Sequence, residues 1–189
     1  MLTALLWLGV PSTADAQERK GFWAGVGVGG GSLGSSSNAA QSDRERTVIS
    51  YFNFGWSIDQ HWSLGFDAGG TESVRAAGFA GTFPYNISGT LAYYPRTASG
   101  FFIKGGAGGS FLEMDIVDEF GTVATINLGT GVGLIAGTGW DVYLGRRFWL
   151  TPAVNVRYGR PGDLILAGRT QVSDWKYNVV DVTIGVKFD

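Results

Sequence analysis

Apolar residues alternate with small or polar residues over most of the chain, and helical spacing is rare. The stretch GFWAGVGVG at residues 21–29 shows this pattern, because glycine occupies alternate positions and Ala24, Val26 and Val28 lie between them. Period-two alternation is typical of β-strands that bury one face. Eight segments share the pattern and are predicted to form strands: 21–33, 46–57, 62–72, 82–94, 100–113, 127–144, 147–159 and 174–188.

The connections between these segments alternate between long and short. Long stretches follow the first, third, fifth and seventh segments, and they cover 34–45, 73–81, 114–126 and 160–173. Short turns follow the second, fourth and sixth segments. Outer-membrane barrels have short turns on the periplasmic side, longer loops outside and an even number of strands. The sequence therefore predicts an all-β fold, an eight-stranded antiparallel up-and-down transmembrane β-barrel with four long extracellular loops.

Each predicted strand has one bulky apolar face and one face of glycine, small polar residues and a few charges. The small face is poor in the lysine and glutamate that solvated surfaces prefer, and its charges nearly balance. Buried charges need partners, so we expect this face to line a narrow lumen. The glycines of the first strand on this face are Gly25, Gly27 and Gly29. The charged residues predicted to form a polar network there are Asp67, Lys104, Asp141, Arg157, Asp181 and Lys187.

Aromatic residues gather at one end of the predicted strands. Tryptophan and tyrosine rings prefer the headgroup level of a bilayer, and aromatic girdles mark transmembrane barrels. We expect a periplasmic girdle of Phe22, Trp23, Trp56, Trp62, Tyr93, Phe101, Phe148 and Phe188.

The start of the chain has the features of an export signal. An apolar run at 2–10 is the length of a signal-peptide core, and Ala14-Asp15-Ala16 supplies a small-residue cleavage site. We therefore expect a cleaved signal peptide at 1–16 and a barrel domain at 17–189. The net charge of −2 argues against a nucleic-acid partner, and the absence of cysteine excludes disulfides and thiolate chemistry.

The strand count, the loop pattern and the leader resemble small eight-stranded outer-membrane β-barrel proteins of Gram-negative bacteria, such as the OmpA transmembrane domain and OmpX. The first strand GFWAGVGVGGG and the ending TIGVKF at 183–188 carry the likeness, although Asp189 follows the final aromatic residue. The resemblance implies a monomer in the bacterial outer membrane, in contact with membrane lipids and lipopolysaccharide. It also implies insertion by the barrel-assembly machinery and a structural or surface-interaction role.

Other functions fit parts of the sequence. A lumen lined by glycines leaves room for a narrow pore or an OmpW-like channel for small molecules. A lipid A-modifying enzyme is less well supported, because the single histidine, His61, falls in a predicted periplasmic turn. A soluble lipocalin-like carrier would bury the apolar face instead. The Gly-rich start lacks the lysine of a phosphate loop, and no catalytic residue, cofactor or metal site is predicted.

Overall fold

The computed structural model describes residues 19–38, 41–72, 74–76, 79–117 and 123–189. The expected signal peptide at 1–16 lies outside these residues. None of the described residues belongs to a helix that is long and apolar enough to cross a membrane. The strands are β1 (Gly21–Ser36), β2 (Glu45–Ser57), β3 (Trp62–Thr71), β4 (Val74–Ala76), β5 (Phe79–Tyr93), β6 (Phe101–Val117), β7 (Val123–Trp140), β8 (Val142–Gly145), β9 (Phe148–Leu166) and β10 (Arg169–Phe188).

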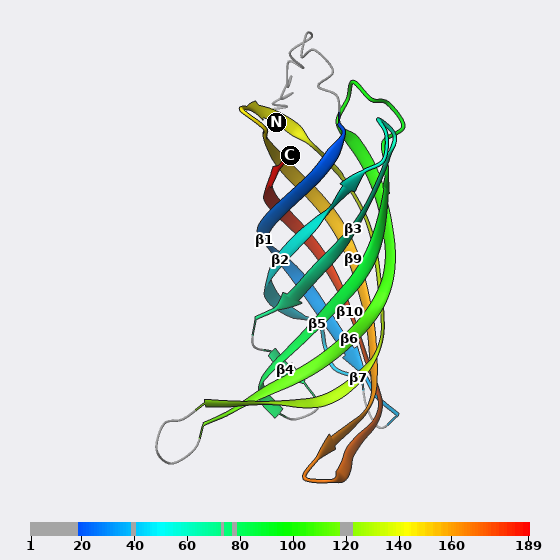
Figure 1. The fold of residues 1–189 in the computed structure, drawn as a ribbon. Helices are drawn as coiled ribbons and strands as arrows, with labels where there is room; N and C mark the ends of the chain where they lie inside the picture. The colour runs from blue at the N-terminus through cyan, green and yellow to red at the C-terminus, as the bar shows by residue number, and fades with distance from the viewer. Residues whose placement is uncertain (1–18, 39–40, 73, 77–78, 118–122) are drawn as a thin grey trace, which may run out of the picture.

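The strands form a closed antiparallel barrel (Figure 1). The order of pairing around the barrel is β1, β2, β3, β5, β6, β7, β9, β10, and β10 also pairs with β1, which closes the sheet. Two barrel strands are interrupted: β3 and β4 both pair with β5, and β7 and β8 both pair with β9. The structure thus confirms the predicted eight-stranded up-and-down barrel.

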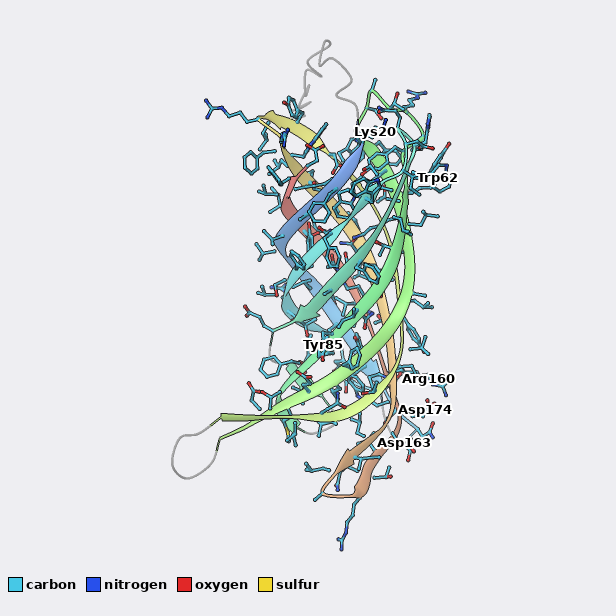
Figure 2. All side chains as sticks on the ribbon, in the orientation of Figure 1. Lys20, Trp62, Tyr85, Arg160, Asp163 and Asp174 are labelled. Atoms are coloured by element: carbon cyan, nitrogen blue, oxygen red, sulfur yellow. The ribbon has the colours of Figure 1, made fainter. Side chains whose placement is uncertain are left out.

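The two ends of the barrel differ. The start of β1, the end of β10 and the short turns lie at one end, which we call the terminal end (Figure 1). At the other end, the hairpin end, the β6–β7 and β9–β10 hairpins extend beyond the rest of the wall (Figure 1). In Figure 2, Trp62 lies toward the terminal end, whereas Arg160 and Asp174 lie toward the hairpin end.

The fourth predicted loop, 160–173, is instead mostly a β-hairpin. Strands β9 and β10 continue through this segment and meet at a two-residue turn, Ala167-Gly168, whose φ angles of 51° and 73° are both positive. Two consecutive positive φ values define the type I′ turn that suits tight hairpins. The Pro161-Gly162 pair indicated a loop, but register shifts between β9 and β10 accommodate it. Strands β6 and β7 likewise cover most of the predicted loop 114–126.

The outer wall of the barrel is apolar and the inner wall is largely polar. Val26 on β1 and Val182 on β10 are 58% and 63% exposed, whereas the neighbouring lumen residue Asp181 is 1% exposed. A soluble barrel has the opposite arrangement, with its large apolar side chains inside. The exposed apolar belt continues over β2, β3, β5, β6, β7 and β9.

Seven of the eight predicted girdle residues occupy outward positions at the terminal end. Strand pairing sets Phe22 beside Trp56, Trp62 beside Tyr93, and Phe148 beside Phe188, and Phe101 stands beside Trp140. Ring centroids within these last three pairs lie 4.6 to 5.6 Å apart.

The assignment of Trp23 to the girdle is wrong, because its side chain is buried inside the barrel at 8% exposure. Its indole nitrogen donates a hydrogen bond to Ser63 Oγ at 2.7 Å. Alternation along β1 explains this placement, since Trp23 shares its face with Gly25, Gly27 and Gly29 rather than with Phe22.

Candidate functional site

The middle of the lumen holds the buried residues Asp67, Arg157 and Asp181 and the partly buried Lys104, from four strands, which we call the central cluster. Asp67 of β3 accepts hydrogen bonds from Lys104 Nζ of β6 at 3.1 Å and from Arg157 Nη1 of β9 at 2.7 Å. Arg157 Nε also donates to Asp181 Oδ2 of β10 at 3.2 Å. One guanidinium therefore joins two carboxylates from strands that are not adjacent to each other.

Neutral polar groups complete the central cluster. Asn155 of β9 donates from Nδ2 to Asp181 Oδ1 at 2.7 Å and to Thr183 Oγ1 at 3.3 Å. The side chains of Asp67, Arg157 and Asp181 are at most 4% exposed. Charges this deeply buried stay ionised only when partners replace the water that they lose.

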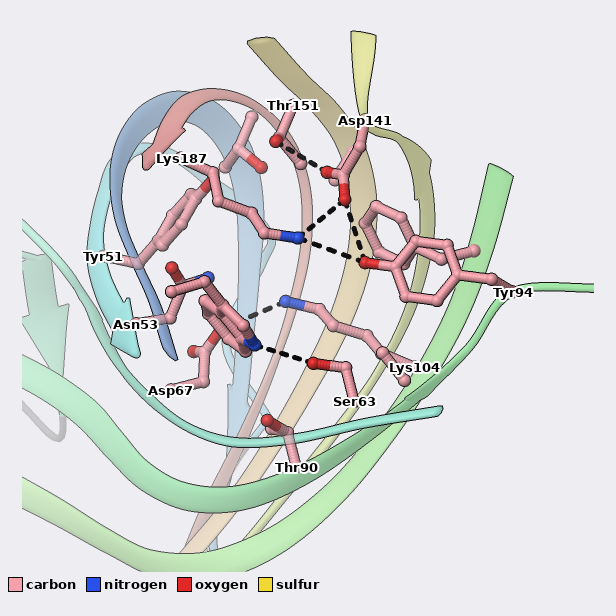
Figure 3. Close-up of a pocket in the computed structure, with 15 residues that line it drawn as sticks. Tyr51, Asn53, Ser63, Asp67, Thr90, Tyr94, Lys104, Asp141, Thr151 and Lys187 are labelled. Carbon is pink, nitrogen blue, oxygen red and sulfur yellow. Dashed lines mark hydrogen bonds and ion pairs between the residues drawn. The ribbon is translucent and has the colours of Figure 1, made fainter. Parts of the chain in front are cut away.

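A second buried group, the end cluster, lies closer to the terminal end (Figure 3). Asp141 Oδ2 accepts hydrogen bonds from Lys187 Nζ at 2.8 Å and from the Tyr94 hydroxyl at 2.9 Å. Thr151 Oγ1 donates to Asp141 Oδ1 at 2.8 Å. Lys187 Nζ also lies 5.1 Å from the centre of the Trp23 ring, which is within cation–π range.

Arg19, which precedes β1, covers the end cluster from the terminal side. Its guanidinium carbon lies 4.4 Å from the Tyr94 ring centre and 5.4 Å from the Trp149 ring centre. Its Nη1 donates to the backbone oxygen of Thr97 at 3.0 Å. Arg19 is only 5% exposed, so it closes the mouth of the barrel over these aromatic rings.

Toward the hairpin end the lumen becomes apolar. A layer of neutral hydrogen bonds joins Tyr177 to Asn86 and Ser110. Beyond this layer lies an apolar cluster of buried side chains from most of the barrel strands. Its members are Leu33, Ile49, Leu112, Met114, Leu128, Leu164, Trp175, Tyr177 and Val179. The barrel is therefore filled by packing at this end rather than by ion pairs.

A small cavity of about 50 Å³ remains between the central cluster and the end cluster (Figure 3). Asp67, Lys104, Asp141 and Lys187 all contribute to its lining. A buried water needs about 10 to 15 Å³ of such volume, whereas small-molecule sites usually measure about 300 to 1,000 Å³. The cavity thus suits a few waters and is too small for an organic ligand.

Glycines on the lumen face make room for larger neighbours. A Cβ at Gly27 would lie 2.5 Å from ring atoms of Tyr51, which is far closer than real contacts allow. Asn53 and Thr183 occupy the corresponding space beside Gly25 and Gly29. The large side chains that cover these three glycines thus come from adjoining strands rather than from across the barrel.

All six charges that the sequence placed in the lumen form ion pairs there, but in two groups instead of one network. Asp67, Lys104, Arg157 and Asp181 make up the central cluster, while Asp141 and Lys187 belong to the end cluster. Sequence reasoning missed Tyr94, Asn155 and Trp23, although the alternation of β1 already places Trp23 on the lumen face.

His61 lies in the turn between β2 and β3, at the terminal end. The backbone N–H groups of His61 and Trp62 donate to Asp59 Oδ1, each at 2.7 Å. These hydrogen bonds lower the pKa of Asp59, because they stabilise its charged form. The Asp59 carboxylate thus serves as a turn acceptor. These hydrogen bonds hold the backbone of the turn. Among the described residues, no hydrogen bond joins His61 to a serine, as a serine hydrolase would require.

Three solved structures share this architecture over nearly their whole length. Ail, the attachment invasion locus protein of Yersinia pestis, has a TM-score of 0.60 at 10% identity, covering 89% of this chain and 99% of its own. Neisserial surface protein A has a TM-score of 0.59 at 17% identity, covering 88% and 96%. The outer membrane protein AlkL, solved in lipid bilayers, has a TM-score of 0.50 at 15% identity, covering 95% and 94%.

No protein-family model and no curated protein matches the sequence. The likeness therefore rests on shape, and at these identities it concerns the fold. The closed strand order, the outward apolar belt and the three structural matches agree with one another. The chain has the fold of the small eight-stranded outer-membrane β-barrel proteins.

Proposed function

We propose that this chain is an integral protein of a bacterial outer membrane, with a structural or surface-interaction role and a closed lumen. The observation that carries the proposal is the combination of an apolar outer wall with buried ion pairs inside. A β-barrel satisfies every backbone group in hydrocarbon because its sheet has no edge. The apolar belt then contacts lipid, and the ion pairs are shielded from it.

The same observation argues against a soluble lipocalin-like carrier. Such a carrier would present its polar face to water and keep an apolar cavity inside. Here Phe52, Leu64 and Val132 are each about half exposed on the outside. An exposed apolar surface of this extent on a monomer indicates contact with another apolar phase.

The orientation follows from the two ends of the barrel. Short turns face the periplasm in outer-membrane barrels, and the longer connections face outward. We therefore assign the terminal end to the periplasm and the hairpin end to the cell exterior. The aromatic pairs at the terminal end would then lie at the inner headgroup level.

A narrow pore is the alternative function, and the cavity of about 50 Å³ beside the central cluster favours it. Two features oppose it. The ion pairs of both clusters span the lumen, and the apolar cluster fills it at the hairpin end. Ions would have to cross a dry segment, so we propose that the resting barrel does not conduct.

We further propose that the protein is a monomer that contacts outer-membrane lipids and lipopolysaccharide, and that the barrel-assembly machinery inserts it after removal of residues 1–16. The strand end 183–188 would serve as the insertion signal. Phe188 points outward at the end of β10, and the carboxylate of Asp189 accepts a hydrogen bond from the Trp149 indole at 3.0 Å. We propose no catalytic activity and no nucleic-acid partner.

Heat-modifiable migration tests the barrel. Protein that has been inserted into outer membranes should migrate differently in SDS gels before and after boiling, because a lipid-stable barrel resists unfolding by SDS. Unchanged mobility together with full solubility without detergent would overturn the proposal. Planar-bilayer recording separates the two lumen hypotheses: silence supports the closed barrel, and steady conductance supports the pore.

A further inference from the structure

Two arginines lie on the outer wall just beyond the apolar belt at the hairpin end. Arg46 of β2 shares the outward face with Val48, which is 41% exposed and marks the edge of the belt toward the hairpin end. Arg44 precedes β2 and extends across β1 to β10. In the orientation proposed above, on which this inference rests, both guanidinium groups sit at the level of the outer headgroups.

Arg44 is held flat against the wall by neutral groups. Its Nε and Nη2 donate to the side chain and the backbone oxygen of Ser32, at 2.9 and 2.7 Å, and its Nη1 donates to Asn178 Oδ1 at 2.6 Å. The lack of a side chain at Gly34 allows this close approach, because a Cβ there would lie 3.2 Å from Nη1. The position of the charge is therefore fixed by neutral acceptors, and no carboxylate takes part in these hydrogen bonds.

The surrounding acids leave these two cations available. Among the described residues, no carboxylate lies within 4.0 Å of either guanidinium. Asp43 and Glu45 adjoin the two arginines in the sequence, and the Glu72 N–H donates to the Val48 oxygen on the neighbouring strand, yet none of these three acids forms an ion pair with Arg44 or Arg46. Farther round the wall, Arg160 and Lys176 differ from this pair, since both bind Asp174.

A groove lies farther along the same outward face, beyond Val48 and toward the terminal end. It is a hollow of about 430 Å³ between β2, β3 and β5, and its floor is formed by the small residues Ser50, Ala68 and Gly70. The flanking side chains that line it are Phe52, Tyr85 and Ile87. Ser50 is four residues from Arg46 on β2, which is about 13 Å along a strand.

We propose that this wall binds one lipid of the outer leaflet that carries a phosphate on its headgroup. The phosphate would lie against Arg44 and Arg46, and one acyl chain would lie in the groove. Arginine recognises phosphate through paired N–H donors, and an apolar groove within the belt accepts a hydrocarbon chain. Two arginines and an apolar groove on one wall are complementary to an amphiphile, which has a charged headgroup and a hydrocarbon chain. A soluble polyanion would leave the groove unoccupied.

The test measures lipid binding to detergent-purified barrel by native mass spectrometry, with phosphatidic acid as the probe and phosphatidylcholine as the neutral reference. We expect a clear preference for phosphatidic acid. A cation that contacts the lipid headgroup contributes about fivefold to binding, so the double variant R44Q/R46Q should lose about 25-fold. The matched control R146Q/R147Q changes two arginines in the turn at the opposite end and should keep the wild-type preference.

Two further variants separate the parts of the site. S50W fills the groove and should weaken phosphatidic acid without changing the response to inorganic phosphate. E72Q removes the neighbouring negative charge and should strengthen binding. Equal loss in R44Q/R46Q and R146Q/R147Q, or competition by inorganic phosphate at the same concentration as the lipid, would overturn the proposal.

Failure of this inference can be distinguished from failure of the proposed function. Each variant is also tested for heat-modifiable migration in SDS. A barrel that shifts on boiling but shows no preference for phosphatidic acid refutes the lipid site alone. A chain that does not shift at all refutes the membrane barrel and the site with it.

Discussion

The two halves of the lumen close the same barrel by different means. The half toward the terminal end contains the central and end clusters, in which each carboxylate pairs with a cation and Asp141 and Asp181 also accept hydrogen bonds from neutral groups. The half toward the hairpin end contains the apolar cluster, and the neutral Tyr177 layer lies beside it. One barrel thus holds polar side chains in one half of its lumen and apolar side chains in the other.

The difference follows from the side chains on the lumen face of each strand. On β1 that face runs through Gly25, Gly27 and Gly29 and then reaches Leu33. The glycine section leaves room for long polar side chains, and the leucine section takes part in packing. Buried ion pairs need exact partners and therefore favour one strand register, whereas apolar packing tolerates exchange of similar volumes.

Removing Arg157 should lower the free energy of unfolding more than any other change, because two buried carboxylates lose an ion-pair partner. In R157M, Asp67 keeps only Lys104, and Asp181 loses its cation. Breaking a buried ion pair from one side costs about 3 to 5 kcal/mol, so urea unfolding in lipid vesicles should show a loss near the middle of that range. The control R160M alters an exposed arginine three residues along β9, and it should lose only the small contribution of the surface ion pair with Asp174. Equal losses in the two variants would mean that the central cluster does not stabilise the barrel.

Shortening an apolar side chain tests the other half. Leu164 is fully buried in the apolar cluster, and burial of this kind makes leucine-to-alanine changes cost about 2 to 5 kcal/mol. L164A should therefore unfold at lower urea. It should remain silent in planar bilayers, because small apolar cavities stay dry. The adjacent control, I165A, changes a residue that is 51% exposed and should have little effect. Ion conductance by L164A would show that the apolar cluster does not exclude water.

Adding a side chain on the glycine face of the polar half should destabilise the barrel less than the two changes above. A valine at Gly27 would collide with the Tyr51 ring, and overpacking of this kind costs about 1 to 3 kcal/mol. The double variant G27V/Y51A should regain part of that loss, since the ring is removed. In contrast, a Cβ at the outward Gly30 meets nothing within 4 Å, so G30V should fold as well as wild type. Destabilisation of G30V as large as that of G27V would place the cost in the strand backbone instead of in the ring contact.

Much of this architecture could be predicted from the sequence, because alternation with period two reports which face each residue occupies. At the terminal end of the barrel, the predicted strand bounds agree with the observed ones to within one residue. The same alternation placed Asp67, Arg157 and Asp181 on the lumen face. The hairpin end was harder to predict. Strands β9 and β10 run past Pro161 and Gly162 with shifted register, and a shift of one residue exchanges the two faces.

The division of the charges into two clusters could not be predicted either. Parity gives the face of a residue but not its height along the barrel axis, which depends on the stagger between strands. Asp141 and Asp181 share the lumen face, yet they belong to different clusters, because Asp141, in the break between β7 and β8, and Asp181 of β10 lie at different heights. Arg19 lies before the first predicted strand, and Tyr94 is the last residue of the predicted segment 82–94 but follows the end of β5.

The smallest expected effect lies outside the lumen, in the exposed pair of Arg160 and Asp174 on the β9–β10 hairpin. The hydrogen bond from Arg160 Nε, at 2.7 Å, holds the pKa of Asp174 below its usual value of 3.8. A carboxyl group whose pKa is lower in the folded state stabilises the fold above its unfolded pKa and loses this contribution as the pH falls. The benefit of Asp174 over D174N should therefore be present at pH 6 and fade below about pH 4. Asparagine also tolerates the positive φ of 52° at this position, so D174N removes the charge without straining the backbone.

Carboxyl-carbon NMR of the hairpin during an acid titration measures the pKa of Asp174 directly. A midpoint at the ordinary aspartate value would show that this contact contributes nothing in solution, in contrast to the buried pairs of the central cluster.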